Sequence, residues 1–320
     1  MTVLPATSLN SPIRTRRQRL TRAFLIYVLV PYFSVTLIFT VLQRKLMYRP
    51  TKAVSLKVAD LRLDPSRIRD VQIQTYDGTT LNGWLLLPPT TSSDVPENPV
   101  GEKKKQSQTE LLVIYFPGNA QNRSLRRNDL EEIARCGFHV LIFDYRGYGD
   151  NSGSPSETAI TSDTREIWNF AHEELQFSDE QIVLFGESLG GAVALSLWDD
   201  ASGDHPQPQA VLLSSTFASM TRTVACNYPG FLFQYLVLDK WRSIDRISRV
   251  KAPLRIFHGT SDKLIPIEEA RLLAFASGDT SRLTEIPDGE HNDIPMHLLR
   301  QELRRIRDTA NGIVANEVSF

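Results

Sequence analysis

The heptapeptide FGESLGG at residues 185–191 places one serine between two glycines, each two positions away from it. The apolar run IVLF leads into it and GAVALSLW leads out, which predicts a strand that turns sharply into a helix. At so sharp a turn the serine backbone is strained, and glycines at 186 and 190 remove the Cβ atoms that would clash. We therefore expect Ser188 at the tip of the turn, with its hydroxyl above the strand end and a helix N-terminus beside it.

Short apolar runs on both sides of this turn predict a parallel sheet covered by helices. Strands at 71–76 and 80–87 around Asp77-Gly78 are expected as an opening hairpin. Six further runs each end in a polar or glycine-bearing turn: LLVIYF, HVLIFDY, QIVLFGE, AVLLSST, PLRIFHG and RLTEIP. Polar residues thus gather at strand carboxyl ends, where open α/β sheets bind their ligands. A helix is expected at 155–175, with Ser154 as its cap and Glu157 as the capping-box partner.

A nucleophilic serine needs a base, usually a histidine that is held by a carboxylate. After a turn of this kind the partners follow in the order acid, histidine. His291 lies in a glycine-bearing loop just past a strand and is the predicted base for Ser188. His258 lies within an apolar strand and is expected in the core, His205 lies in a turn without a strand behind it, and His297 lies at a helix start.

Asp262 is the predicted acid, because it follows the strand LRIFHGT and precedes His291 by 29 residues. Both would then lie on neighbouring loops at one edge of the sheet. The alternative for Asp262 is the N-cap of a helix over IPIEEARLLAFA. Asp144 and Asp150 precede the serine, and Asp293 is too near His291 in sequence to orient it.

A tetrahedral intermediate needs two N–H donors for its oxyanion. Leu189, directly after the serine, offers the first backbone amide. The second is expected in FPGNAQN, where the chain turns at Gly118 and presents the amide of Asn119 or Ala120; Asn119 is preferred. The prediction concerns the backbone, and the side chain of Asn119 is free to tie the loop.

The charge balance argues against a nucleic-acid-binding protein. Lys and Arg number 36 against 37 Asp and Glu, and five of the arginines lie in the first 22 residues, which leaves 31 basic and 37 acidic residues. Cys136 and Cys226 give neither a disulfide framework nor a zinc spacing, and both are expected in the core. We predict no metal and no organic cofactor.

Residues 23–42, AFLIYVLVPYFSVTLIFTVL, carry no charge and are long enough to cross a bilayer as a helix of about 30 Å. Pro31 is tolerated in membrane helices. A single-pass anchor is the preferred interpretation, and the alternatives are a signal peptide, for which no small-residue cleavage site follows, or a buried helix. The arginines before the segment favour a cytoplasmic N-terminus, with the rest of the protein on the non-cytoplasmic side.

The chain carries, in order, the motifs LQRKLMYRP, PGNAQN, DYRGYGDNSGSPSE, GESLGG, HGTSDKLIP and GEHND. With these motifs the sequence resembles the α/β-hydrolase fold, and specifically its membrane-tethered serine hydrolases with one anchor. The resemblance covers roughly residues 42–310, and the family's triad maps onto Ser188, Asp262 and His291. It implies a mostly parallel sheet with helices on both faces. The expected organisation is a basic segment 1–22, an anchor 23–42, a linker 43–69, a hydrolase domain 70–310 and a tail 311–320.

Residues 217–247 are a candidate lid over an acyl pocket, and the alternative is ordinary helix packing. The segment crowds together apolar side chains, namely Tyr228, Phe231, Leu232, Phe233, Tyr235, Leu236 and Leu238.

The expected activity is hydrolysis of carboxylic ester or thioester bonds in a small, lipid-like or acylated substrate at a lipid bilayer. Family members include esterases, thioesterases and lipases, so the resemblance leaves the acyl and alcohol groups open. The alternatives are a serine aminopeptidase or oligopeptidase with the same triad, and a non-enzymatic membrane scaffold that keeps the fold. The sequence gives no oligomeric state.

Overall fold

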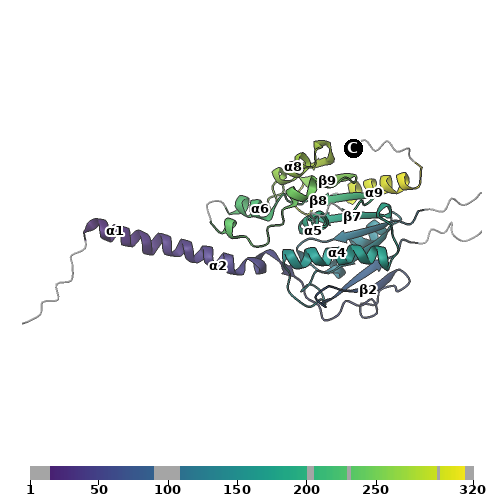
Figure 1. Ribbon diagram of the computed structural model, residues 1–320, viewed down its shortest axis with the longest axis horizontal. Helices are drawn as coiled ribbons and strands as arrows, with labels where there is room; N and C mark the ends of the chain where they lie inside the picture. Colours follow the sequence, from purple (N-terminus) through teal and green to yellow (C-terminus); the bar gives the residue numbers. More distant parts are fainter. Residues whose placement is uncertain (1–14, 90–108, 200–204, 229–231, 294–295, 314–320) are drawn as a thin grey trace, which may run out of the picture.

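The computed structural model describes residues 15–89, 109–199, 205–228, 232–293 and 296–313. A central sheet with helices on both faces forms the body, and a long N-terminal helix extends away from it (Figure 1). The described residues leave out residues 1–14 of the expected basic segment, residues 90–108, Phe231 and most of the expected tail, as well as the side chain of Leu232.

The central sheet has eight strands in the order β10-β9-β8-β7-β4-β6-β3-β2. All neighbouring pairs are parallel except β2 with β3 and β3 with β6, so the predicted hairpin and parallel sheet are confirmed. After β4 the chain forms β6 on one side of it and then β7 on its other side. At such a change of direction a crevice opens at the carboxyl ends of the strands, here β4 and β7. The strands are β2 Ile68–Gln74, β3 Thr80–Leu86, β4 Leu112–Phe116, β6 His139–Phe143, β7 Ile182–Glu187, β8 Ala210–Ser214, β9 Leu254–Gly259 and β10 Leu283–Ile286.

The strands alternate their side chains between two apolar cores, one on each face of the sheet. In β4, Leu112, Ile114 and Phe116 belong to one core, whereas Val113 and Tyr115 belong to the other. Because both faces are covered, the central strands are apolar except at their ends, as buried parallel strands are. This rigid centre fixes the loops that leave its carboxyl edge.

Helices of the first core are α4 Glu157–Glu173, α5 Leu189–Leu195, α7 Ser243–Ile247 and α8 Ile267–Ala276, and those of the second are α3 Arg127–Ala134 and α9 Met296–Ala310. The 3₁₀ turns are η3 Arg123–Arg126, η4 Asp179–Gln181, η5 Ser196–Trp198, η6 Leu232–Leu236 and η7 Thr280–Arg282. A short parallel pair joins β1 Arg49–Pro50 to β5 Ala120–Gln121. Helix α6 Met220–Asn227 and η6 lie at the rim, beside the end of the N-terminal helix (Figure 1).

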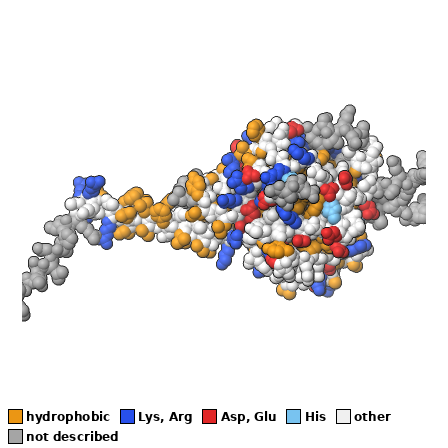
Figure 2. Space-filling model, viewed as in Figure 1, with side chains coloured by type: hydrophobic (Ala, Val, Ile, Leu, Met, Phe, Trp, Pro, Cys, Tyr) orange, Lys and Arg blue, Asp and Glu red, His pale blue; other side chains and the backbone are white. Residues whose placement is uncertain are grey.

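The N-terminal helix runs from Arg16 to Met47 as α1 Arg16–Phe24, the π-helical turn η1 Leu25–Leu29 and α2 Val30–Met47. It is the one helix among the described residues that is long and apolar enough to cross a membrane, and almost none of its apolar stretch is buried. Pro31 has no N–H and its ring crowds the preceding turn, which accounts for the widened turn just before it. Apolar side chains line this helix up to its junction with the body (Figure 2).

The predicted cap of the α4 helix is wrong. The helix begins two residues later than expected. Its N-cap is Ser156 and not Ser154, and the hydroxyl of Ser156 accepts a hydrogen bond from the amide of Ala159. Glu157 does not act as a capping-box partner, because its carboxylate accepts hydrogen bonds from the amide of Trp241 and the guanidinium of Arg246. A tertiary contact therefore outweighs the local motif.

The two cysteines have different environments. Cys136 is buried in the second core as expected, whereas Cys226 is exposed, so the core prediction for Cys226 is wrong. The reason is the position of α6 at the rim of the molecule, where Thr223 is its only buried residue.

Candidate active site

Ser188 lies at a strained turn between β7 and α5. Its backbone has φ +53° and ψ −117°, a conformation that costs free energy for any residue with a Cβ. The turn is held from β8, because the amide of Ser188 donates to the carbonyl of Ser214 at 2.8 Å and the hydroxyl of Thr216 donates to the carbonyl of Ser188 at 2.8 Å. The predicted turn is therefore present.

Glycines at 186 and 190 allow α5 to approach the sheet closely. A Cβ on Gly186 would lie 2.5 Å from the carbonyl oxygen of Gly190, and a Cβ on Gly190 would overlap the carbonyl oxygen of Phe116. Neither glycine has a positive φ, so their role is space and not backbone freedom.

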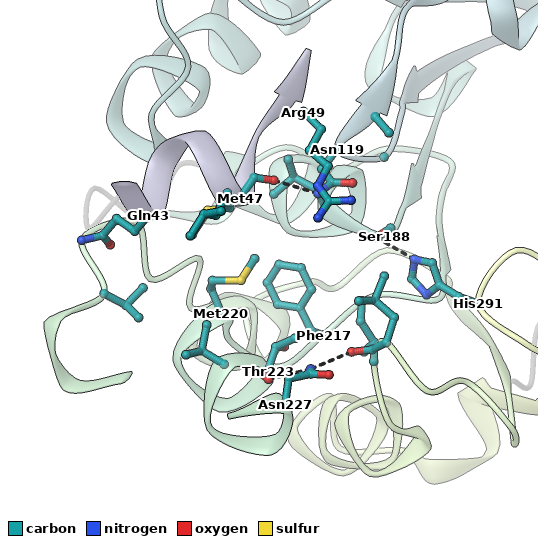
Figure 3. A pocket seen from close by; sticks show the side chains of 18 of the residues that line it. Gln43, Met47, Arg49, Asn119, Ser188, Phe217, Met220, Thr223, Asn227 and His291 are labelled. Carbon is teal, nitrogen blue, oxygen red and sulfur yellow. Dashed lines mark hydrogen bonds between the residues drawn. The ribbon is translucent and has the colours of Figure 1, made fainter. Parts of the chain in front are cut away.

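Ser188, His291 and Asp262 form one chain of hydrogen bonds at the carboxyl edge of the sheet. The hydroxyl of Ser188 lies 3.1 Å from Nε2 of His291 (Figure 3). On the other side of the ring, Nδ1 of His291 lies 2.7 Å from Oδ2 of Asp262. With the proton on Nδ1, the imidazole donates to Asp262 and its Nε2 accepts from the serine. The structure thus brings together the three side chains that the sequence singles out.

Asp262 is buried and accepts several hydrogen bonds. Burial alone would raise its pKa, but hydrogen bonds from His258, from His291 and from the amide of Ile265 outweigh it and hold the pKa well below the ordinary 3.8. Of these, His258 is the weaker partner, because its Nε2 lies 2.8 Å from the carbonyl of Ile265 and 3.4 Å from Asp262. The carboxylate is therefore ionised beside His291 at neutral pH.

The helix-cap alternative for Asp262 is wrong. Helix α8 begins at Ile267 behind Pro266, without a side-chain cap. Asp262 instead closes its own loop, because its Oδ1 accepts from the amides of Leu264 at 2.9 Å and Ile265 at 2.8 Å. These bonds leave Oδ2 for His291.

The other histidines lie as the sequence predicts or outside the triad. His258 is fully buried in β9, and His297 is in the first turn of α9. Asp293 accepts from the amide of Glu290 at 3.1 Å and so closes the loop that carries His291.

Two backbone amides lie beside Ser188. The amide of Leu189 is the first in α5, and no acceptor in the described part of the chain takes it. The loop after β4 lies against Ser188, since a Cβ on Gly118 would be 3.6 Å from the Cβ of that serine. The amide of Asn119 likewise donates to no acceptor among the described residues.

Asn119 is tied to the end of α2. Its side chain donates to the carbonyl of Met47 at 2.7 Å, and its carbonyl accepts from the amide of Arg49 at 3.1 Å and the hydroxyl of Tyr148 at 2.8 Å (Figure 3). The backbone N–H of Asn119 is thus the group of this residue that has no acceptor among the described residues.

Sequence reasoning missed two groups that support this site. The hydroxyl of Ser215 donates to the carbonyl of His291 at 2.9 Å and so holds the histidine loop. Glu187, next to the serine, accepts from the hydroxyl of Tyr115 at 2.6 Å and forms an ion pair with Arg126 at 3.0 Å. Only the polar ending of AVLLSST pointed toward Ser215, and no motif pointed to Tyr115.

A cavity of about 510 Å³ opens in front of Ser188 and His291. Its walls come from α2, from α6 with η6, and from the loop after β9 (Figure 3). Phe217, Met220 and Phe233 of the candidate lid segment line it, so this part of the segment forms a wall of the cavity. Whether it moves as a lid stays a prediction.

A family model for the α/β hydrolase fold matches residues 112–231. An uncharacterized protein of Mycobacterium tuberculosis is 34% identical over 251 residues, which are 78% of this chain and 81% of that protein. The chain is an α/β hydrolase. The hydrolase is also similar to Protein bem46 of Schizosaccharomyces pombe, at 30% identity over 70% of each chain.

Solved structures agree with the fold of this α/β hydrolase. An esterase of Pyrococcus furiosus matches 82% of the chain and 97% of its own with a TM-score of 0.58 at 18% identity. An α/β hydrolase of Vibrio vulnificus matches 78% and 83% with a TM-score of 0.59 at 17% identity. At such low identity these likenesses show the fold alone, and the chemistry must be argued from the side chains.

Proposed function

We propose that this α/β hydrolase is a serine hydrolase that cleaves carboxylic ester or thioester bonds through an acyl-enzyme intermediate. The observation that carries the proposal is the imidazole of His291, which is bonded on one side to the hydroxyl of Ser188 and on the other to Asp262. A serine needs such a base to become nucleophilic at neutral pH.

In the first half of the reaction, Oγ of Ser188 attacks the substrate carbonyl carbon and its proton passes to Nε2 of His291. The carbonyl oxygen becomes an oxyanion, and the amides of Leu189 and Asn119 donate to it. His291 then gives its proton to the departing alcohol or thiol, which leaves an acyl group on Ser188.

In the second half, water takes the place of the leaving group. His291 removes a proton from the water while its oxygen attacks the acyl carbon, and the proton returns to Ser188 as the acid leaves. Asp262 keeps the proton of His291 on Nδ1 and stabilises the imidazolium that forms in each half. Removal of one oxyanion donor costs about 2.7–4 kcal/mol in comparable sites.

We further propose that α1, η1 and α2 form a retained membrane anchor. Arg44 in α2 donates to both carboxylate oxygens of Asp239 at 2.9 and 3.0 Å, and Tyr48 donates to the same carboxylate at 3.1 Å. Asp239 is buried, so removal of Arg44 would leave a charged group with one partner fewer. Within the apolar span itself, the ring of Phe39 stacks on that of Phe233 with centroids 4.9 Å apart, a contact that cleavage after the span would remove, which favours an anchor over a cleaved signal peptide. The orientation predicted from the arginines stays a prediction.

The experiment that tests the proposal compares p-nitrophenyl esters, an acyl thioester and peptide p-nitroanilides as substrates of the full-length protein. We expect hydrolysis of esters or thioesters, and Ser188→Ala should lower kcat/KM by at least about a thousandfold, because the triad acts as a unit. Ser152→Ala, at an exposed loop serine, is the matched control and should leave the rate unchanged. Preferential cleavage of the anilides would indicate a peptidase, and no hydrolysis at all would indicate a non-catalytic scaffold.

A further inference from the structure

The N-terminal helix contributes side chains to the cavity that holds Ser188. Phe39, Thr40, Gln43 and Met47 of α2 line it. Their spacing of three and four places them on one face of the helix. A tether that only held the body at a membrane would not need a face inside the active-site cavity.

The opposite wall of the cavity is aromatic near this helix. The ring of Phe39 stacks on that of Phe233 with centroids 4.9 Å apart, and it lies 5.9 Å from the ring of Tyr228. Both partners also line the cavity. Three aromatic rings therefore lie at the end of the cavity away from His291, beside the polar side chains of Thr40 and Gln43, and offer an apolar surface to hydrocarbon.

Helix α2 is fixed against this wall by polar bonds. The side chain of Gln43 donates to the carbonyl of Leu236 at 3.2 Å and accepts from the amide of Leu238 at 2.7 Å. Together with the Arg44–Asp239 ion pair, these bonds hold the helix in register with η6. Helix α2 is therefore a fixed wall of the cavity.

The apolar end of the cavity lies at the depth of the predicted membrane span. Phe39 and Thr40 fall within residues 23–42, and Met47, at the catalytic end, follows Thr40 by about 10 Å along the helix. Beside them Tyr235 and Leu238 are 72% and 61% exposed, although both are apolar and near the helix. Exposed apolar groups continuous with a membrane helix are expected to lie in the bilayer.

We infer that the anchor helix forms part of the substrate site, and that the occupant is the acyl chain of a bilayer lipid, lying between α2 and α6 with its ester carbonyl at Ser188. The inference rests on the proposed serine hydrolase activity and adds the substrate class. The acyl chain of the lipid enters the cavity sideways from the hydrocarbon layer of the bilayer, and its ester bond is cleaved where α2 leaves the membrane.

The test uses a tryptophan that fills the cavity from α2. Full-length protein in phosphatidylcholine vesicles is assayed with 4-methylumbelliferyl palmitate and 4-methylumbelliferyl acetate. Thr40→Trp should lower kcat/KM for the palmitate at least tenfold relative to the acetate, since the indole occupies the place of the acyl chain. Val41→Trp adds the same group on the exposed side of the same turn, and should leave the palmitate-to-acetate ratio within twofold.

The outcomes separate this inference from the proposed function. The inference is overturned if Thr40→Trp does not change the palmitate-to-acetate ratio, or if both tryptophan variants change it equally. The proposed function still stands in that case, provided that acetate hydrolysis depends on Ser188. If wild-type protein cleaves neither of these esters nor an acyl thioester, the proposed function fails, and the inference fails with it.

A second readout does not depend on catalysis. Vesicles that contain a phosphatidylcholine with a diazirine on its acyl chain are irradiated with the Ser188→Ala protein, and the modified peptides are mapped. We expect labelling of α6, across the cavity from the anchor, which Thr40→Trp removes and Val41→Trp retains. Labelling confined to the N-terminal helix would contradict an acyl chain in the cavity.

Discussion

At the scale of single residues, the side chains proposed to be catalytic are predictable from the sequence, and the residues that support them are not. Ser188 and His291 lie in turns with marked local chemistry, a glycine-flanked serine and a glycine-bearing loop, and the sequence predicts both. Ser215 bonds the carbonyl of His291, 76 positions away, and Tyr115 bonds Glu187 from a neighbouring strand. Such contacts depend on strand order and register, which an apolar pattern does not encode.

The ionised carboxylate of Asp262 makes stability depend on pH. Its pKa is lower in the folded protein than the ordinary 3.8, so its hydrogen bonds stabilise the fold above that pH and are lost as the pH falls below it. At neutral pH we expect Asp262→Asn to lower the free energy of unfolding by about 1.5–3 kcal/mol. Urea unfolding of the two proteins should show this difference shrinking from pH 5 toward pH 3.

Asp293→Asn is the control for that measurement, since it replaces a carboxylate on the loop that carries His291, one that accepts from the amide of Glu290 and not from the imidazole. A difference between wild type and Asp262→Asn that stays constant or grows on acidification would show that the ionised form is not the one stabilised.

At the scale of elements, periodicity predicts the strands and most helices, but local motifs fail where tertiary bonds compete. The hairpin of β2 and β3 and the parallel strands are as expected. The cap of α4 is not, because Glu157 bonds Arg246 instead. The short β1–β5 pair was not predicted either, since two residues carry no periodic signal.

The contact between α5 and the sheet leads to a prediction about Gly190. An added Cβ would overlap the backbone carbonyl of Phe116, and the backbone cannot give way as a flexible side chain would. Gly190→Ala should destabilise the protein by about 1–3 kcal/mol or more, measured as a lowered Tm. Gly118→Ala adds a Cβ at ordinary contact distance and should change the Tm little. Equal melting of both variants would contradict the close approach of α5.

At the scale of the whole molecule, the sequence predicts an anchor and a hydrolase domain but not their contact. The bonds between Gln43 and Leu238 and between Arg44 and Asp239 join residues 195 positions apart. From the sequence alone, Gln43 and Arg44 belong to the expected linker, and Leu238 and Asp239 belong to the candidate lid. Only the folded chain shows that the end of the N-terminal helix lines the same cavity as Ser188.

The most direct test of the proposed Ser188–His291 chemistry is to map the reactive serine. Full-length protein is treated with a fluorophosphonate, digested, and analysed by mass spectrometry, beside His291→Ala protein of unchanged Tm. We expect one adduct, on Ser188, formed rapidly in wild type and at least about a thousandfold more slowly without His291. An adduct on another serine, or equally fast modification of Ser188 without His291, would contradict it.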